Sequence, residues 1–381
     1  MKLKQIPEDF VVREVYELNR LLGDNKEDSA KTYKYVKLTK KDYSQQRAID
    51  KVARIFSVSR KNIHFAGTKD KVGITTQIIS INGISEDRLN MHLRYFNENV
   101  DDIELEYIGA GDKRINLGDN LGNDFEIIIR DLVQSEIDEI EENISKIRQN
   151  GTLNYYDSQR FGYANNSHKI GILILKNEIK QAVYEILTSV PQNPNEKISN
   201  FAKQVEENFD SIENGDQKII KQIIEQAPKF MYIEKSILEH LKKHKNDFPG
   251  ALRTIPKKMR TMYISAYQSY IFNKLLDKFE NKYSFLPLIN SGTVFENEEI
   301  ESEVKKILQE DDLTLENFEL NSMPELKVDI DTHRKAVVYA DGIDIVEVLE
   351  DDLNENKLKA KVKFFLEKGA YATNVVKSLL Q

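Results

Sequence analysis

The feature of this sequence that most restricts its fold is a change of pattern along the chain. In the first 150 residues, short strand-like stretches alternate with helix-like stretches. From about residue 165 to 285 the pattern becomes nearly continuous helix, and strand-like stretches return between Lys335 and Leu366. A helical block set between two strand-rich blocks predicts an insertion into a discontinuous α+β sheet domain.

The composition indicates an ordered, soluble protein with two domains or one large one. The chain has 381 residues, of which 40% are hydrophobic and 31% are charged, and it has no cysteine, which excludes disulfides and thiolate chemistry. Its apolar runs are shorter than a membrane span, and its start, MKLKQIPEDF, lacks the apolar core of a signal peptide. A cytoplasmic protein without membrane association is therefore expected.

The net charge of −8 argues against nucleic-acid binding, but the charge is unevenly distributed. Residues 31 to 71 contain twelve Lys and Arg side chains and three Asp side chains, which is a local balance of +9. Surface electrostatics act over roughly 10 Å at 0.1 M salt, so a local basic face can bind a polyanion on an acidic protein. A solvated helix face explains the same charges equally well.

A polar loop with the sequence GTKDKVG, at residues 67–73, lies between two predicted strands. The first strand is the apolar run Ile63–Ala66, and the second is Thr75–Ile81. An isolated aspartate in such a loop, here Asp70, is more often a turn residue than a catalytic group. The residues around Asp70 therefore decide between the two interpretations.

The segment FAGTKDKVGITTQ, at residues 65–77, resembles the signature around the catalytic aspartate of the TruD family of tRNA pseudouridine synthases. Four more segments resemble family blocks in the same order and span nearly the whole chain: PEDFVVRE at 7–14, NYYDSQRFG at 154–162, AYQSYIFNKLL at 266–276 and FFLEKGAYAT at 364–373. The third of these, around residue 270, is also expected to be a packed helix, because its apolar residues recur at helical spacing.

The sequence departs from the family pattern at five positions. Tyr156 replaces phenylalanine, Asp157 and Ala370 replace glycine and serine, and Glu367 replaces proline. Gly73 replaces alanine, which is expected to be a small steric change. None of these changes removes a group that the chemistry requires.

The resemblance implies both a fold and a reaction. The fold would be the α+β pseudouridine-synthase sheet domain, at residues 1–153 and 331–381, with a helix-rich TruD insertion domain at 154–330. The reaction would convert uridine to pseudouridine in tRNA, commonly at uridine 13, in a monomeric enzyme without metal. Because the reaction breaks the N1–C1′ bond and rejoins the base through C5, it is an isomerisation that needs no cofactor.

The resemblance also implies the catalytic residues. Asp70 would be the catalytic carboxylate, and Lys4 would be the cation that stabilises its charged form. Lys2, Lys69 and Lys71 are possible substitutes for Lys4. Lys69 and Lys71 are in addition candidates for contacts to RNA phosphates.

Five further residues are candidates for binding the nucleotide. Tyr156 and Tyr371 could stack on a base, or they could be core aromatics. The amide of Asn154 could bind the O4 and N3 edge of uracil, because an amide has both a donor and an acceptor. Arg160 is either a phosphate ligand or part of a structural salt bridge. Glu14 is either a hydrogen-bonding group in the pocket or an exposed strand residue.

Two other functions remain open from the sequence. An RNA-binding module that kept the fold without the catalysis would bind tRNA and form no pseudouridine. A hydrolase with Asp70 and Glu14 as its two carboxylates would bind its substrate with little salt dependence. No zinc site is predicted from His240 and His244, because the glutamate of His-Glu-x-x-His and a third ligand are missing.

Overall fold

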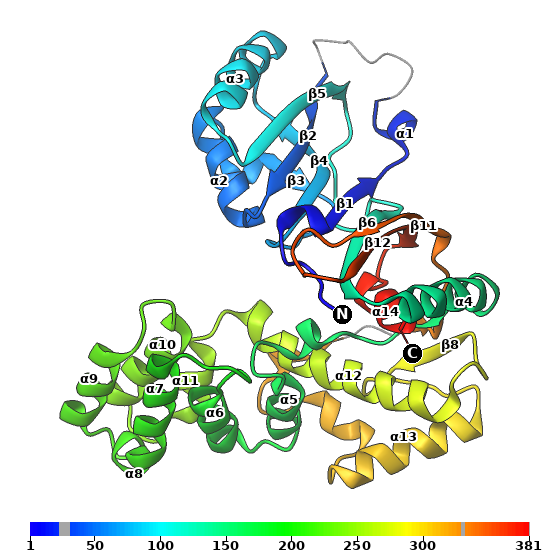
Figure 1. Cartoon of the computed structure of the whole chain (residues 1–381). Coiled ribbons are helices and arrows are strands. Elements are labelled where there is room, and N and C mark those ends of the chain that lie inside the picture. Colours follow the sequence, from blue (N-terminus) through cyan, green and yellow to red (C-terminus); the bar gives the residue numbers. More distant parts are fainter. Residues whose placement is uncertain (23–30, 329–331, 381) are drawn as a thin grey trace. The chain divides into compact units, whose positions relative to one another are not determined.

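The computed structural model describes residues 1–22, 31–328 and 332–380 (Figure 1). The chain divides into two compact units. The sheet unit contains Met1–Thr152 and Val338–Gln381, and the helical unit contains Leu153–Val337. The chain passes between them through two short strands that pair with each other, β7 (Thr152–Leu153) and β10 (Val337–Val338). The α+β fold class predicted from the sequence is confirmed.

In the described part of the sheet unit, eight strands form one mixed sheet in the order β11-β12-β6-β1-β4-β2-β5, with β3 paired to β4. β1 and β4 are parallel, whereas β1–β6, β6–β12, β11–β12, β2–β4, β2–β5 and β3–β4 are antiparallel. The strands are β1 (Phe10–Val15), β2 (Tyr33–Lys41), β3 (Ile63–Phe65), β4 (Ile74–Asn82), β5 (Ile103–Gly111), β6 (Gly122–Leu132), β11 (Asp341–Glu350) and β12 (Leu358–Glu367).

Helices cover one face of this sheet through two apolar clusters. Val52 and Phe96, from α2 (Gln45–Ile55) and α3 (Glu86–Asn99), pack with the strand residue Val36. The second cluster joins α4 (Gln134–Asn150) and α14 (Ala372–Ser378) to β1, β6 and β12. A short helix, α1 (Leu18–Leu22), follows β1, and the 3-10 turns η1 (Pro7–Asp9) and η2 (Arg60–Asn62) complete the unit.

Between the two apolar clusters, the same face of the sheet carries buried polar side chains. Thr75 is in register with Val12 on one side and with Lys40 on the other, so the three side chains point to one face. Glu14 and Gln77 follow two residues after Val12 and Thr75 and therefore share this face. All four polar residues are 9% exposed or less. Polar groups that interrupt a core face in this way indicate a functional site.

The helical unit is built from nine described helices around one apolar core. The helices are α5 (Ser167–Leu175), α6 (Ile179–Thr188), α7 (Glu196–Glu207), α8 (Phe209–Glu213), α9 (Gln217–Gln226), α10 (Tyr232–Lys243), α11 (Phe248–Arg253), α12 (Lys257–Phe279) and α13 (Glu298–Glu310). Strands β8 (Phe285–Leu288) and β9 (Thr332–Lys335) pair, and η3 (Ser158–Phe161), η4 (Leu315–Glu319) and η5 (Pro324–Leu326) are 3-10 turns.

Helix α12 is the packed helix that the sequence predicted. Its residues Tyr267, Ile271 and Leu275 are fully buried. Gly171 of α5 lies against this helix, and a Cβ at that position would be 2.3 Å from the carbonyl oxygen of Tyr263, so only glycine allows the close approach. Within the described ranges, no helix is both long enough and apolar enough to cross a membrane.

Candidate functional site

The loop that contains Asp70 connects β3 to β4 and is fixed by a side chain of α2. Gln45, the first residue of that helix, accepts a hydrogen bond from the backbone amide of Lys69 at 2.8 Å. The side-chain amide of Gln45 also donates to the carbonyl of Gly67 at 3.3 Å. The start of the loop is therefore held in a defined conformation.

Gly73 fixes the end of the loop. Its φ is +111°, and a Cβ at this position would lie 2.4 Å from the carbonyl oxygen of Phe10. The carboxylate of Asp42 accepts a hydrogen bond from the Gly73 amide at 2.9 Å. The expectation that glycine in place of alanine is a small steric change is therefore wrong, because the backbone conformation and the neighbouring strand both require glycine here.

Asp70 lies on the loop with its side chain 42% exposed. The Nζ of Lys4 is 3.5 Å from its Oδ2, and the same ammonium lies 3.7 Å from the centroid of the Phe10 ring. Lys2, one of the possible substitutes for Lys4, instead pairs with Asp131 at 3.5 Å. An exposed carboxylate with an ammonium beside it can attack a sugar carbon or accept a proton.

Lys40 of β2, which the sequence analysis did not single out, contacts the backbone of Asp70. Its ammonium donates a hydrogen bond to the Asp70 carbonyl, and the residue is fully buried. Burial lowers the pKa of Lys40 to about 8, although the charge of Asp70 acts in the opposite direction. The sequence contained a signal for this position, because Val36, Leu38 and Lys40 alternate along one strand and therefore share a face.

Glu14 and Lys69 form a buried ion pair next to the loop. Their charged atoms are 2.6 Å apart, and the side chains are 0% and 9% exposed, respectively. Tyr16 donates a hydrogen bond to Glu14 at 2.5 Å, and Lys69 donates one to Asn123 at 2.9 Å. Burial and the charge of Glu14 raise the pKa of the Tyr16 phenol above its ordinary value, so Tyr16 remains a donor.

These contacts exclude one of the two interpretations of Glu14. It is a hydrogen-bonded, buried residue and not an exposed strand residue. A phosphate contact by Lys69 would require its ammonium to leave Glu14, whereas Lys71 is exposed and has no such constraint.

Gln77 and Thr75 of β4 are buried polar residues of the same face. Each is 1% exposed, and neither side-chain amide nor hydroxyl has a hydrogen-bond partner within the described parts of the chain. Leaving such a group unpaired destabilises a fold by about 1–3 kcal/mol. These residues form the Thr-x-Gln part of the family signature, and their unsatisfied groups are consistent with a role other than folding.

In the helical unit, Asn154 holds a cation against an aromatic ring. The guanidinium of Arg334 lies 4.0 Å from the centroid of the Tyr156 ring. Arg334 donates to the side-chain oxygen of Asn154 at 2.7 Å, and the side-chain nitrogen of Asn154 donates to the carbonyl of Lys335 at 2.9 Å. Both polar atoms of the Asn154 amide therefore bind the protein. Sequence reasoning missed Arg334, because it lies 180 residues from Asn154 and outside every family block.

Arg160 also lies near Tyr156, with its guanidinium 5.3 Å from the ring centroid. It donates a hydrogen bond to Ser269 at 2.9 Å and forms no ion pair with any residue that the structure describes. Tyr371 is half-buried and directly precedes α14. The structure thus divides the predicted residues between the two units: Lys4, Glu14, Lys69, Asp70, Lys71 and Tyr371 in the sheet unit, and Asn154, Tyr156 and Arg160 in the helical unit.

A mixed sheet with an exposed aspartate on a glycine-bounded loop, in a chain with a large helical unit, agrees with the pseudouridine-synthase class of fold that the sequence resemblance implies. The family model for tRNA pseudouridine synthase D (TruD) matches residues 1–285 and 280–379. The chain therefore belongs to the TruD family, which is a family of isomerases.

Archaeal relatives match along the whole chain. The "Probable tRNA pseudouridine synthase D 2" of Methanocaldococcus jannaschii is 30% identical over 411 aligned residues, which cover 99% of this chain and 91% of the relative. The "Probable tRNA pseudouridine synthase D" of Nanoarchaeum equitans is 31% identical, with coverages of 100% and 98%. The crystal structure of a protein assigned as tRNA pseudouridine synthase D from Methanosarcina mazei superposes with a TM-score of 0.76 at 27% identity, covering 100% of this chain and 93% of that one.

Proposed function

We propose that this protein converts uridine to pseudouridine in tRNA, at uridine 13, with Asp70 as its catalytic carboxylate. The observation that supports the role of Asp70 is its position. It is the exposed carboxylate of the signature loop, and the ammonium of Lys4 lies 3.5 Å away. The names of the archaeal relatives support tRNA as the substrate.

The reaction requires few groups from the protein. The N1–C1′ bond of uridine breaks, the uracil turns, a C5–C1′ bond forms, and the proton on C5 is lost while N1 gains one. Atoms and electrons balance within the nucleoside, so no oxidant or reductant takes part. The carboxylate of Asp70 can begin this sequence in two ways, by attack at C1′ or by removal of the C2′ proton.

Neighbouring side chains fix Asp70 for this step. Lys4 opposes the charge of the carboxylate, and Lys40 holds the backbone carbonyl of the same residue. The Glu14–Lys69 pair holds the segment directly before Asp70. In this proposal Lys69 positions the loop, and the exposed Lys71 contacts an RNA phosphate.

The target base must leave the RNA stack to reach a carboxylate. Tyr156 and Tyr371 are the residues that we assign to stacking on it, since base–aromatic stacking contributes about 1–3 kcal/mol. Asn154 was predicted to bind the uracil edge. Because its amide already binds Arg334 and a backbone carbonyl, we assign it the role of holding Arg334 on the Tyr156 ring.

The experiment is to incubate the purified protein with unmodified tRNA transcripts and to locate new pseudouridine by sequencing. We expect modification at uridine 13. Asp70→Asn should lower turnover by a factor on the order of 10³ or more, with tRNA affinity within about threefold of wild type. Asp101→Asn, which removes an exposed carboxylate of the same unit, is the matched control and should retain activity.

Each alternative function predicts a different result. Wild-type protein that binds tRNA without forming pseudouridine would favour the RNA-binding module. Normal turnover by Asp70→Asn would exclude Asp70 as the catalytic group. Substrate binding that does not weaken with salt would contradict an RNA substrate and favour the hydrolase.

A further inference from the structure

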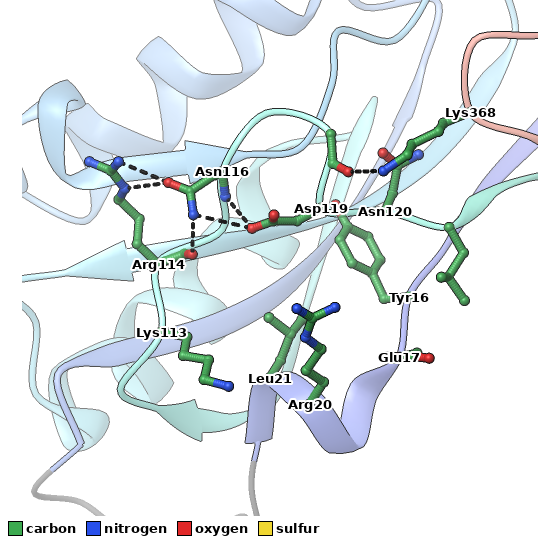
Figure 2. Close-up of a pocket in the computed structure, with 12 residues that line it drawn as sticks. Tyr16, Glu17, Arg20, Leu21, Lys113, Arg114, Asn116, Asp119, Asn120 and Lys368 are labelled. Atoms are coloured by element: carbon green, nitrogen blue, oxygen red, sulfur yellow. Dashed lines mark hydrogen bonds between the residues drawn. The ribbon is translucent and has the colours of Figure 1, made fainter.

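A pocket of about 720 Å³ lies in the sheet unit (Figure 2). Residues 16–21, at the end of β1 and in α1, form one wall, and residues 113–121, between β5 and β6, form most of the rest. Lys368, which directly follows β12, completes the lining. Ligand pockets of about 300–1,000 Å³ enclose small organic molecules, so a nucleotide fits this volume.

The lining of the pocket carries a net positive charge. It contains four cations and two carboxylates, a balance of +2: Arg20, Lys113, Arg114 and Lys368 against Glu17 and Asp119. Asp119 accepts hydrogen bonds from the backbone and side-chain nitrogens of Asn116 at 2.7 and 3.3 Å, which disperse its charge. The pocket therefore favours an anion.

Within the described residues, two of the four cations have side chains that are available for a ligand. Arg114 is bonded to Asn116 at 2.8 Å, and Lys368 donates to the carbonyl of Gly118 at 2.6 Å (Figure 2). The side chains of Arg20 and Lys113, in contrast, have no hydrogen-bond or ion-pair partner among the residues that the structure describes. In Figure 2, the side chain of Arg20 extends from α1 toward Tyr16 and Asp119.

The walls of the pocket are bonded to the segments that hold Asp70. Tyr16 lines the pocket, and its hydroxyl binds Glu14, the partner of Lys69. The amide of Gly118 donates to the carbonyl of Ala66, at the end of β3, at 2.8 Å. A ligand in the pocket would therefore be placed in a fixed relation to the catalytic loop.

We propose that this pocket binds one nucleotide of the tRNA that flanks the target uridine, with Arg20 and Lys113 as the ligands of its phosphate. The inference rests on the proposed function, because it takes tRNA as the substrate. Phosphate contacts set the position of a nucleic acid on a protein and carry no sequence information. Arg20 and Lys113 therefore contribute to binding and to register, and the chemical step does not depend on them.

The test compares two double variants by binding of tRNA, by binding of uridine 5′-monophosphate and by steady-state kinetics. Arg20→Ala with Lys113→Ala should raise the Kd and the KM for tRNA about tenfold and leave kcat within about twofold. The slope of log affinity against log salt should fall by about one for each lost contact. Arg88→Ala with Arg94→Ala removes two exposed charges from α3 of the same unit and should change neither value. Thermal unfolding checks that all variants are folded.

Three results would overturn the pocket assignment. The first is an equal loss of tRNA affinity in the α3 variant. The second is a lower kcat at unchanged Kd in the variant without Arg20 and Lys113. The third is that this same variant loses uridine 5′-monophosphate binding but binds tRNA normally. The last result would show that the pocket takes free nucleotides. Failure of the proposed function can be distinguished from failure of the pocket assignment. In the first case wild-type protein would form no pseudouridine, while the Kd of the variants for tRNA would still test the pocket.

Discussion

Two clusters of charged side chains in the sheet unit are built in opposite ways. Arg130 of β6 is 1% exposed, and it donates to Asp9 at 2.8 Å and to Asp351 at 2.6 Å. Asp70, in contrast, has a 42% exposed side chain, and its ion-pair partner Lys4 is 3.5 Å away. A third carboxylate, Asp352, lies 2.9 Å from the same guanidinium and is 55% exposed, but the side chains of Arg130, Asp9 and Asp351 are closed to solvent. The carboxylate of Asp70 is open to solvent.

Hydrogen bonds saturate the closed cluster. The second oxygen of Asp9 accepts the backbone amides of Gln5 and Ile6 at 2.9 and 3.2 Å. Burial by itself raises the pKa of Asp351, but hydrogen bonds from the amides of Asp131 and Leu353 and from two side chains lower it to about 2. The comparison shows two uses of a charged side chain. A buried charge whose oxygens all accept hydrogen bonds stabilises the fold, whereas an exposed charge with few partners can react.

The largest effect on stability is expected for Arg130→Met. Removing the cation leaves the buried carboxylates of Asp9 and Asp351 without their counter-charge, which should reduce the free energy of unfolding by about 3–5 kcal/mol. Chemical denaturation measures this change, and turnover per folded molecule should remain within about threefold of wild type. Asp70→Asn should show the reverse, with a stability change below about 0.5 kcal/mol. A stable Arg130→Met protein without turnover would contradict the division into two kinds of cluster.

Glu14→Gln should have an intermediate effect on both properties. It leaves the buried ammonium of Lys69 without its counter-charge, so we expect a loss of about 1–3 kcal/mol in stability. Because the segment before Asp70 then shifts, kcat should fall by about tenfold or more with little change in KM. A double-mutant cycle with Lys69→Met measures the coupling, which should be about 0.5–3 kcal/mol. Additive effects would show that the pair does not act as a unit.

A smaller effect is expected from the pH dependence of stability. Lys40 has a folded pKa of about 8, below its ordinary value of 10.5, because it is buried. Between these pH values the unfolded chain binds the proton and the folded chain does not, so the contribution of Lys40 to stability rises with pH. The unfolding free energy of the wild type minus that of Lys40→Met should therefore increase from pH 8 to 10.5. A flat difference curve would show that Lys40 titrates normally.

The smallest effect is expected for Arg13→Met, on the opposite face of the sheet. Arg13 pairs with Glu126, and the two side chains are 49% and 31% exposed. Since exposed pairs contribute about 0–1 kcal/mol, the unfolding free energy should change within that limit. Arg13→Met is thus the surface counterpart of Arg130→Met, and a loss of several kcal/mol would show that burial does not separate the two cases.

Local sequence patterns predicted much of the fold. The change from alternating to continuous helical periodicity predicted an α+β fold with a helical block, and the order of the family blocks identified Asp70 and Lys4 as candidates. The sequence could not show the Arg130 cluster, because Asp9 and Asp351 lie 121 and 221 residues from Arg130. The alternation of Phe10, Val12 and Glu14 along β1 could have placed Glu14 on the buried face, but the identity of its partner depends on tertiary structure.

Gly73 has a consequence for redesign of this enzyme. Because a methyl group there would overlap the main chain of Phe10, the reactive loop and the first strand of the sheet cannot be varied independently. A mutant library that seeks new RNA targets should therefore leave residues 10 and 73 unchanged. Diversity is better introduced at an exposed position of the loop such as Val72, which is 43% exposed.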